Sequence, residues 1–132
     1  MKNISERLNL IQPSPIRKMF NLAGTKPGTI NLVLGEPDFT TPVNIIEASN
    51  KAYMMGNTHY VHNSGIMELR NAISKTIERE SKIFFNGASQ IVITAGGQEA
   101  LYLTMQILLN PGDEVILSAP FYSPYINEIK LG

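Results

Sequence analysis

The sequence lacks cysteine altogether, which excludes a disulfide framework and thiolate chemistry. It also lacks an excess of either charge. Eleven basic residues balance eleven acidic ones, so there is no electrostatic reason to expect a nucleic acid or an anionic membrane as a partner. No apolar run reaches the length of about 18 residues that spans a bilayer, and the polar N-terminus has no signal-peptide core. We therefore expect a cytoplasmic protein without nucleic-acid or membrane partners.

What remains is the composition of a globular protein. The chain has 132 residues, of which 43% are apolar and 17% are charged, which is enough for one ordinary domain and unlike a disordered tail. Its last residues read as a helix that no further strand follows. Because alternating strands and helices normally continue until the sheet is covered, we expect an incomplete domain.

The stretch Ile91–Leu109 is the most informative part of the chain. Four apolar or β-branched residues at its start predict a short buried strand. Gly96 and Gly97 then permit a sharp turn, and apolar residues at helical spacing follow. A glycine turn that opens a helix presents N–H groups at the positive end of the helix dipole, where a phosphate or carboxylate binds. Neither common phosphate-binding motif is present, so an anion site and a plain tight turn both stay open here.

Helix signals recur elsewhere in the sequence. Ser14 followed by proline predicts a short helix, and Thr41 followed by proline predicts a second one that runs to about Met55. Ser64 is placed to cap the clearest amphipathic helix, whose apolar residues recur at helical spacing. A last helix is expected after the turn-rich segment that contains Tyr122.

Short apolar runs between these helices predict strands. They lie at Ile30–Leu34 and Val115–Ser118, in addition to the strand that begins at Ile91. From residue 90 onward the order is strand, helix, strand, helix, which predicts a parallel, right-handed crossover. The sequence therefore predicts an α/β fold.

Few side chains suggest chemistry by themselves. His59 and His62 lie in a predicted loop with no third ligand at useful spacing, so we expect solvated histidines and no metal site. Glu36 and Asp38 could be paired carboxylates for acid–base work, but the neighbouring glycine and proline favour a shaped loop. No arrangement of serine, histidine and acid stands out.

Two features are expected to meet at one edge of the sheet. The Gly96–Gly97 turn follows one predicted strand, and Phe121 and Tyr122 follow another. Because the carboxyl ends of parallel strands share an edge, backbone N–H donors and a flat ring would face the same crevice. Together they suit a phosphorylated aromatic ligand.

These residues resemble a known family. The chain is similar to the N-terminal part of class I/II aminotransferases, the fold-type I enzymes that use pyridoxal 5′-phosphate. Its second matching segment fits a tyrosine–glycine–leucine–arginine pattern, at Tyr60, Gly65, Leu69 and Arg70. The four segments that carry the resemblance, in the family's order, are Ile30–Pro42, Tyr60–Ile73, Ile93–Leu101 and Leu109–Tyr125.

The resemblance implies a set of ligand-binding residues. Backbone N–H groups around Gly96, Gly97 and Gln98 would hold the cofactor phosphate, and Tyr122 would stack on the pyridine ring. Tyr60 would reach the cofactor phosphate of a partner subunit, which implies a homodimer.

The substrate side of the site is implied in the same way. Gly35 would approach the substrate carboxylate through its backbone, and the helix near Ile16 would line the entrance. The resemblance also places residues 1–40 in an N-terminal arm, a helix and the start of the small domain. Residues 41–132 would form the first part of the large domain, with a mostly parallel sheet and flanking helices.

The residues expected to complete catalysis are absent. No lysine of the chain stands in the family's Schiff-base context, and neither the aspartate that pairs with the pyridine nitrogen nor the late arginine for the substrate carboxylate is present. We therefore expect an N-terminal fragment that is inactive alone.

The predicted reaction is transfer of an amino group from an α-amino acid to a 2-oxo acid. Three alternatives stay open: a carbon–sulfur lyase or a cyclopropane-forming synthase on the same scaffold, and a non-catalytic truncated protein that keeps the cofactor fold.

Overall fold

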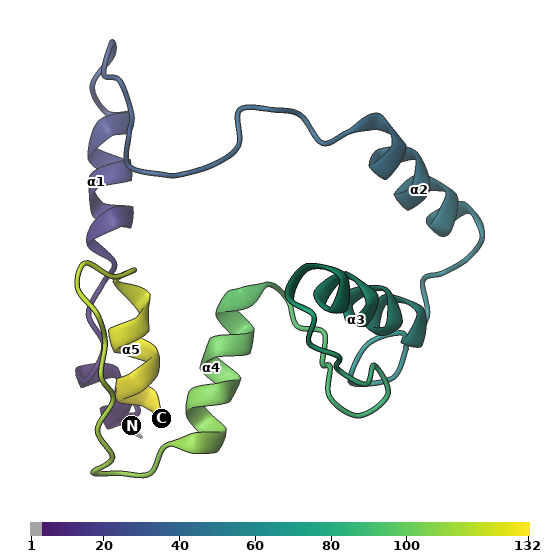
Figure 1. Ribbon diagram of the computed structural model, residues 1–132. Helices are drawn as coiled ribbons and strands as arrows, with labels where there is room; N and C mark the ends of the chain where they lie inside the picture. Colours follow the sequence, from purple (N-terminus) through teal and green to yellow (C-terminus); the bar gives the residue numbers. More distant parts are fainter. Residues whose placement is uncertain (1–3) are drawn as a thin grey trace. The chain divides into compact units, whose positions relative to one another are not determined.

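The computed structural model describes residues 4–132 and is built from helices joined by long connections (Figure 1). The first three residues of the predicted N-terminal arm lie outside the described range. In chain order, the elements are a 3-10 helix η1 and five α-helices: η1 Glu6–Asn9, α1 Pro15–Gly24, α2 Val43–Met54, α3 Met67–Ser81, α4 Gly97–Leu108 and α5 Pro124–Leu131.

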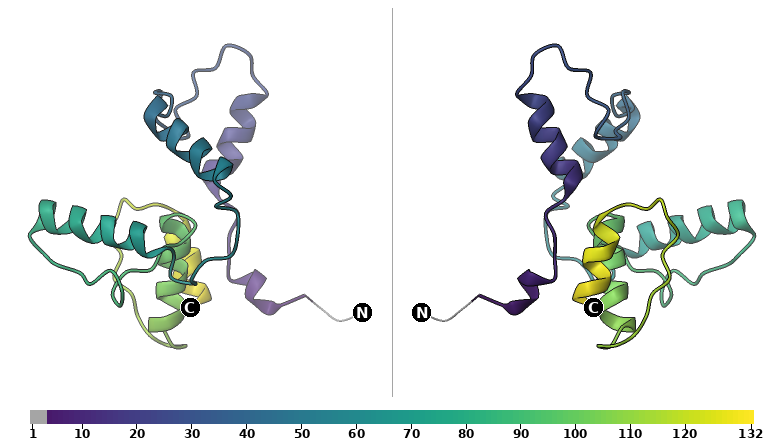
Figure 2. Two further views of the ribbon diagram at one scale, coloured as in Figure 1. Left: turned by 90° about the vertical axis from the view of Figure 1, so that its right-hand side faces the viewer. Right: turned by 90° about the vertical axis from the view of Figure 1, so that its left-hand side faces the viewer.

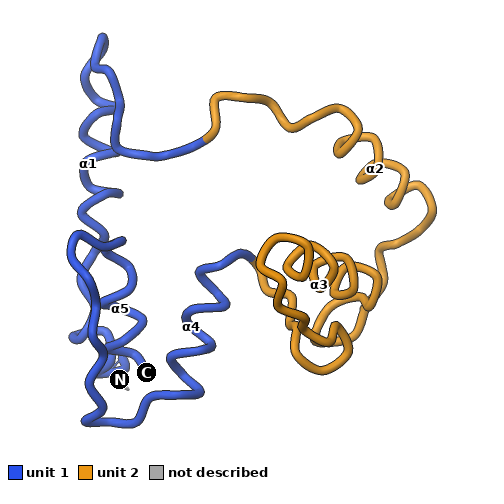
Figure 3. The backbone as a smooth tube through the Cα atoms, viewed as in Figure 1, with its two compact units in different colours: residues 1–36, 96–132 blue, residues 37–95 orange. Residues whose placement is uncertain are grey.

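The chain divides into two compact units, coloured separately in Figure 3. Unit 1 comprises residues 1–36 and 96–132, and unit 2 comprises residues 37–95. Unit 1 therefore holds α1, α4 and α5, whereas unit 2 holds α2 and α3. Each unit is described separately below.

The predicted helices are confirmed, and so is one of the three predicted helix caps. The Ser14 side chain accepts a hydrogen bond from the Arg17 N–H, which satisfies an N-terminal donor of α1. At α2 the cap position is Pro42 itself, without a side-chain bond, so Thr41 does not cap. The prediction for Ser64 is also wrong, since α3 is preceded by Ile66 and has no side-chain cap.

The predicted strands are not observed. Within residues 4–132 no strand is assigned, and Ile30–Leu34, Ile91–Thr94 and Val115–Ser118 run as irregular chain. A strand exists only through ladder hydrogen bonds to a neighbour, and these three segments do not form ladders with one another. Several of their apolar side chains are exposed to solvent, and Ile116 is 99% exposed.

In unit 1, α4 and α5 pack side by side, as the views of Figure 2 also show. The Gln98 side chain, near the start of α4, donates to Glu128 on α5. Further along, Gln106 Nε2 donates to the Leu131 carbonyl at 2.7 Å. On both helices the second contact lies closer to the C-terminus than the first. Therefore α4 and α5 run parallel, and their N-termini lie at the same end of the pair.

In unit 2, two glycines allow close approach of the chain to itself. Gly65 has φ +91°, and an added Cβ would lie 2.7 Å from the Ile93 Cβ. The Ile93 N–H donates to the Ser64 carbonyl at 3.0 Å, which holds the two segments together. An added Cβ at Gly87 would lie 3.2 Å from backbone atoms of Arg70 and Asn71.

Polar side chains, not apolar ones, are the most buried in the described residues. Arg70 Nη1 donates to the carbonyls of Gly87 at 3.0 Å and Ala88 at 3.2 Å. Ser74, one turn further along α3, donates to the Phe85 carbonyl. Arg70, Ser74 and Glu128 fall below a tenth exposed, whereas no apolar side chain of residues 4–132 is fully buried. None of the described helices has the length and apolar character needed to cross a membrane.

Candidate functional site

The N-terminus of α4 is built from glycine. Gly96 holds the cap position with φ +82°, a conformation that residues with a Cβ rarely adopt, and no side chain caps this end. An added Cβ at Gly96 or Gly97 would meet no atom within 4 Å, so open space adjoins the turn. A backbone that opens in this way at the positive end of a helix dipole is able to accept an anion.

Tyr122 lies at the same end of the helix pair as this turn, because it directly precedes α5 and the two helices are parallel. The ring is half exposed and meets the Tyr125 ring edge-on, with centroids 5.5 Å apart and an interplanar angle of 81°. This edge contact orients the Tyr122 ring while leaving much of its surface accessible. The glycine turn and the Tyr122 ring thus lie at the same end of the α4–α5 pair, and a crevice shared by the two stays a prediction.

A groove of about 460 Å³ in unit 1 joins three residues that the sequence pointed to. Ile16 comes from α1, Gly35 from the connection after α1, and Tyr122 from the segment before α5. Together with Val33 and Leu34 they give the groove mainly apolar walls. Residues that lie 19 and 87 positions apart in the chain (16 to 35, and 35 to 122) therefore line one cavity.

Of residues 4–132, Arg17 alone brings a charged side chain to this groove, and sequence analysis missed it. Its guanidinium carbon lies 5.7 Å from the centre of the Phe20 ring. Among the described residues, no carboxylate forms an ion pair with it. The only sequence signal is its place beside Ile16, in a helix whose start was predicted.

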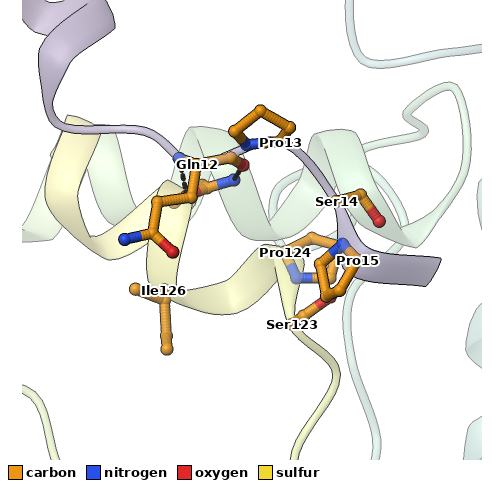
Figure 4. Close-up of a pocket in the computed structure, with 8 residues that line it drawn as sticks. Gln12, Pro13, Ser14, Pro15, Ser123, Pro124 and Ile126 are labelled. Carbon is orange, nitrogen blue, oxygen red and sulfur yellow. Dashed lines mark hydrogen bonds between the residues drawn. The ribbon is translucent and has the colours of Figure 1, made fainter. Parts of the chain in front are cut away.

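A polar clamp holds the segment before α1 against α5, as the dashed lines of Figure 4 show. The Gln12 N–H donates to Asn127 Oδ1 at 3.2 Å, and Asn127 Nδ2 donates back to the Gln12 carbonyl at 3.0 Å. Pro13, Pro15 and Ser123 line a small cavity of about 130 Å³ beside this clamp. The clamp therefore fixes where α1 begins relative to α5, and α1 carries the Ile16 wall of the larger groove.

Tyr60 belongs to unit 2 and is fully exposed. It lines a separate cavity of about 710 Å³ with residues from α2, the loop that follows it and the start of α3. His59 Nδ1 lies 3.2 Å from the Gly56 carbonyl, while His62 Nδ1 accepts from the Ser64 N–H. Among residues 4–132, no group of three or more potential metal ligands occurs. The side chains of Glu36 and Asp38 are exposed, which fits loop positions.

The sequence matches the model of one protein family, aminotransferase class I and II, over residues 27–132. The chain belongs to this family.

Individual members of the family are similar over nearly the whole chain. A probable aspartate aminotransferase of Methanocaldococcus jannaschii is 43% identical over 124 residues, which cover 94% of this chain and 32% of that protein. An aromatic-amino-acid aminotransferase of Thermococcus litoralis is 38% identical, and the match covers 33% of the length of that protein. The chain therefore spans about a third of the length of these relatives.

Solved structures agree with this relationship. A mutant aspartate aminotransferase of Thermus thermophilus superposes with a TM-score of 0.87 at 33% identity, covering 99% of this chain and 35% of that one. A Pyrococcus protein designated A1 gives a TM-score of 0.91 at 34% identity, with 96% of this chain and 32% of that chain covered. The family resemblance seen in the motifs is confirmed, and the chain follows the path of the corresponding part of an aspartate aminotransferase.

Proposed function

We propose that this chain is part of a pyridoxal-phosphate-dependent aminotransferase, an enzyme that moves an amino group from an α-amino acid to a 2-oxo acid. The observation that carries the proposal is the groove of unit 1 that Gly35 and Tyr122 line together, with the α4 glycine turn at the same end of the α4–α5 pair as Tyr122. Membership of the aminotransferase class I and II family supports the same reaction class.

The residues present fit the cofactor. Gly97 and Gln98 open a 12-residue helix, and open space adjoins Gly96, so backbone N–H groups there would hold a phosphate. Tyr122 offers an accessible ring for stacking on a pyridine. When bound, pyridoxal phosphate supplies an electron sink for the carbanion that forms at the substrate α-carbon.

The groove residues would act on the substrate. Gly35 places backbone without a side chain in the wall, which leaves room for a substrate carboxylate, and Ile16 adds an apolar side chain to the same groove. We assign Arg17 the role of attracting a substrate carboxylate, because no other charged side chain of the described range lines this groove.

Several wider features are proposed from the family relationship. Tyr60 would contact the cofactor phosphate of a partner subunit, for which its full exposure in unit 2 leaves it available. This role requires a homodimer. We also propose a domain boundary near residue 40. The N-terminal arm and the start of the small domain lie before it, and the large domain lies after it. The large domain of the whole enzyme would hold a mostly parallel sheet of the fold-type I kind, and the enzyme would be cytoplasmic.

Removing the Tyr122 ring tests the cofactor assignment. Tyr122→Ala is expected to weaken pyridoxal phosphate binding by the 132-residue chain about tenfold, since aromatic stacking contributes about 1.4 kcal/mol. The measurement is equilibrium dialysis followed by the absorbance of the retained cofactor. Tyr53→Ala removes an exposed ring from α2 and serves as the matched control.

Two results would contradict the proposal. Equal affinity of the Tyr122→Ala variant and the parent chain would remove the stacking role. Cofactor that resists dialysis, and becomes permanently attached after borohydride reduction, would show that a lysine of this chain already bonds to it, against the expectation from the sequence.

The role of Arg17 is tested by a pair of neighbouring substitutions. Arg17→Gln is expected to weaken the binding of succinate, a simple dicarboxylate, by about fivefold, because an exposed ion pair contributes up to about 1 kcal/mol. Lys18→Gln removes the same charge from the next residue of α1, which does not line the groove. Isothermal titration calorimetry at low ionic strength measures the succinate affinity of both variants. Equal losses in both variants would mean that net charge alone attracts the ligand.

A further inference from the structure

The turn that follows α3 in unit 2 contains the only asparagine–glycine pair of the sequence, Asn86–Gly87. Because glycine has no side chain, its backbone nitrogen is the least hindered one that can follow an asparagine. Asn86 is exposed to solvent, whereas Gly87 is buried. Water therefore reaches the asparagine side chain, while the neighbouring nitrogen belongs to a packed residue.

An asparagine–glycine pair is able to react with itself in water. The Gly87 nitrogen gives up its proton to a base and bonds to Asn86 Cγ, and the bond from Cγ to Nδ2 breaks. Nδ2 takes up a proton and leaves as ammonia, so that a cyclic imide remains. Water then opens the ring. Aspartate forms when the bond from Cγ to the nitrogen breaks, and isoaspartate forms when the bond from the main-chain carbonyl carbon breaks. Water is the only co-reactant, and no atom is oxidised or reduced.

Hydrogen bonds within the turn hold Asn86. Its Oδ1 accepts from the Ala88 N–H at 2.8 Å, and its own N–H donates to Gln90 Oε1 at 2.8 Å. The Asn86 carbonyl accepts from the N–H groups of Ser89 at 3.2 Å and Gln90 at 2.8 Å. Ring closure joins Cγ and the main-chain carbonyl carbon through one nitrogen, so both carbonyl groups must turn. These bonds oppose that movement.

The attacking residue is held as well. The Gly87 carbonyl accepts from Arg70 Nη1 at 3.0 Å. The Gly87 backbone lies so close to α3 that an added Cβ would be 3.2 Å from backbone atoms of Arg70 and Asn71. The nitrogen that would attack therefore belongs to a buried residue that is fixed on both sides of its α-carbon, and it moves only when the turn opens.

We propose that Asn86 is a site of spontaneous conversion to aspartate and isoaspartate, and that the folded turn of unit 2 keeps this conversion slow. The reaction then proceeds from molecules in which the turn has opened. Isoaspartate adds an atom to the main chain beside Gly87, where the backbone packs closely, so the turn does not close again in the same way. Aspartate keeps an acceptor for the Ala88 N–H. The reaction needs neither the cofactor nor the substrate proposed above.

The test follows the conversion in the 132-residue chain at mildly alkaline pH, in buffer and in concentrated urea. Asn86 lies in the peptide that trypsin releases after Lys82, and mass spectrometry detects the exchange of its amide for a carboxyl group. In urea, Asn86 is expected to react before every other asparagine. In buffer, its conversion is expected to be at least about tenfold slower, because it waits for the turn to open. Asn86→Gln is the matched control, since glutamine would have to close a larger ring, and it is expected to remove the early mass gain.

A second measurement addresses the products. Ion exchange separates converted molecules from the parent by their added negative charge, and digestion with a protease that cleaves at aspartate but not at isoaspartate tells the two products apart. The isoaspartate form is expected to unfold at a lower urea concentration than the parent. The Asn86→Asp variant, which represents the aspartate product, is expected to unfold at the same concentration as the parent.

Three outcomes would overturn the inference. Equal rates at Asn86 in buffer and in urea would show that the folded turn does not restrain the reaction. Earlier conversion of another asparagine in urea, or an unchanged mass gain in Asn86→Gln, would remove Asn86 as the site. An isoaspartate form as stable as the parent would show that the turn closes in spite of the longer main chain.

Discussion

Replacing Arg70 by methionine is expected to cost unit 2 about 3 kcal/mol of its free energy of unfolding. Two hydrogen bonds from one guanidinium nitrogen to the carbonyls of Gly87 and Ala88 are lost. Hydrogen bonds to a charged group each contribute about 1.5–3 kcal/mol, and the lower figure applies to Ala88, which is exposed. Because Gly87 is buried, its carbonyl is left without a partner, which a long apolar side chain does not repair.

The control for Arg70 lies on the same helix. Arg79 is exposed and pairs with Glu80 at 3.1 Å, so Arg79→Met removes the same charge from α3 at a cost below about 1 kcal/mol. Urea unfolding of both variants, followed by circular dichroism, measures the difference. A loss in Arg79→Met as large as that in Arg70→Met would show that the charge of α3, and not the buried contact, sets the stability.

Gly65→Ala is expected to destabilise unit 2 by about 3 kcal/mol. One part is conformational, because φ +91° costs a residue with a Cβ about 1–2 kcal/mol. The other part is steric, because the new Cβ would overlap Ile93 Cγ1 and lie 2.7 Å from Ile93 Cβ, and overpacking costs about 1–3 kcal/mol. Ile93 cannot easily move away, since its N–H is bonded to the Ser64 carbonyl.

A second glycine separates these two costs. Gly56 has φ +80°, but an added Cβ there meets no atom within 4 Å, so Gly56→Ala carries only the conformational cost of about 1–2 kcal/mol. Thermal unfolding of both variants, and of Gly65→Ala combined with Ile93→Ala, measures each part. Equal losses at Gly65 and Gly56, with no recovery from Ile93→Ala, would show that Ile93 is not in the way.

These two residues explain part of the family motif in unit 2. Gly65 and Arg70 belong to the pattern that also contains Tyr60 and Leu69. In the structure, Gly65 admits Ile93, and Arg70 holds the turn at Gly87. Both contacts fix the chain that leads toward the glycine turn of α4, whereas Tyr60 is exposed and makes a different kind of contribution. One motif thus combines structural residues with one proposed to bind a ligand.

The helices were predictable because their signals are local. Serine before proline marks the start of α1, and glycines followed by apolar residues at helical spacing mark α4. The predicted strands failed for the opposite reason. Ile30–Leu34 has the apolar character of a strand, but a ladder needs a neighbouring segment, and local composition does not say whether one is present.

The sequence by itself determined the helical segments, the glycine turn and the family to which the chain belongs, because each depends on residues that are close in the chain or on a motif pattern. Only the tertiary structure decided which polar groups are buried and what lines the groove. Gln98 meets Glu128 across 30 positions, and Arg70 meets Gly87 across 17. Arg17 joins the groove with Tyr122 in the same way. Burial and hydrogen bonding depend on distances in space, which neither spacing nor composition specifies for residues so far apart.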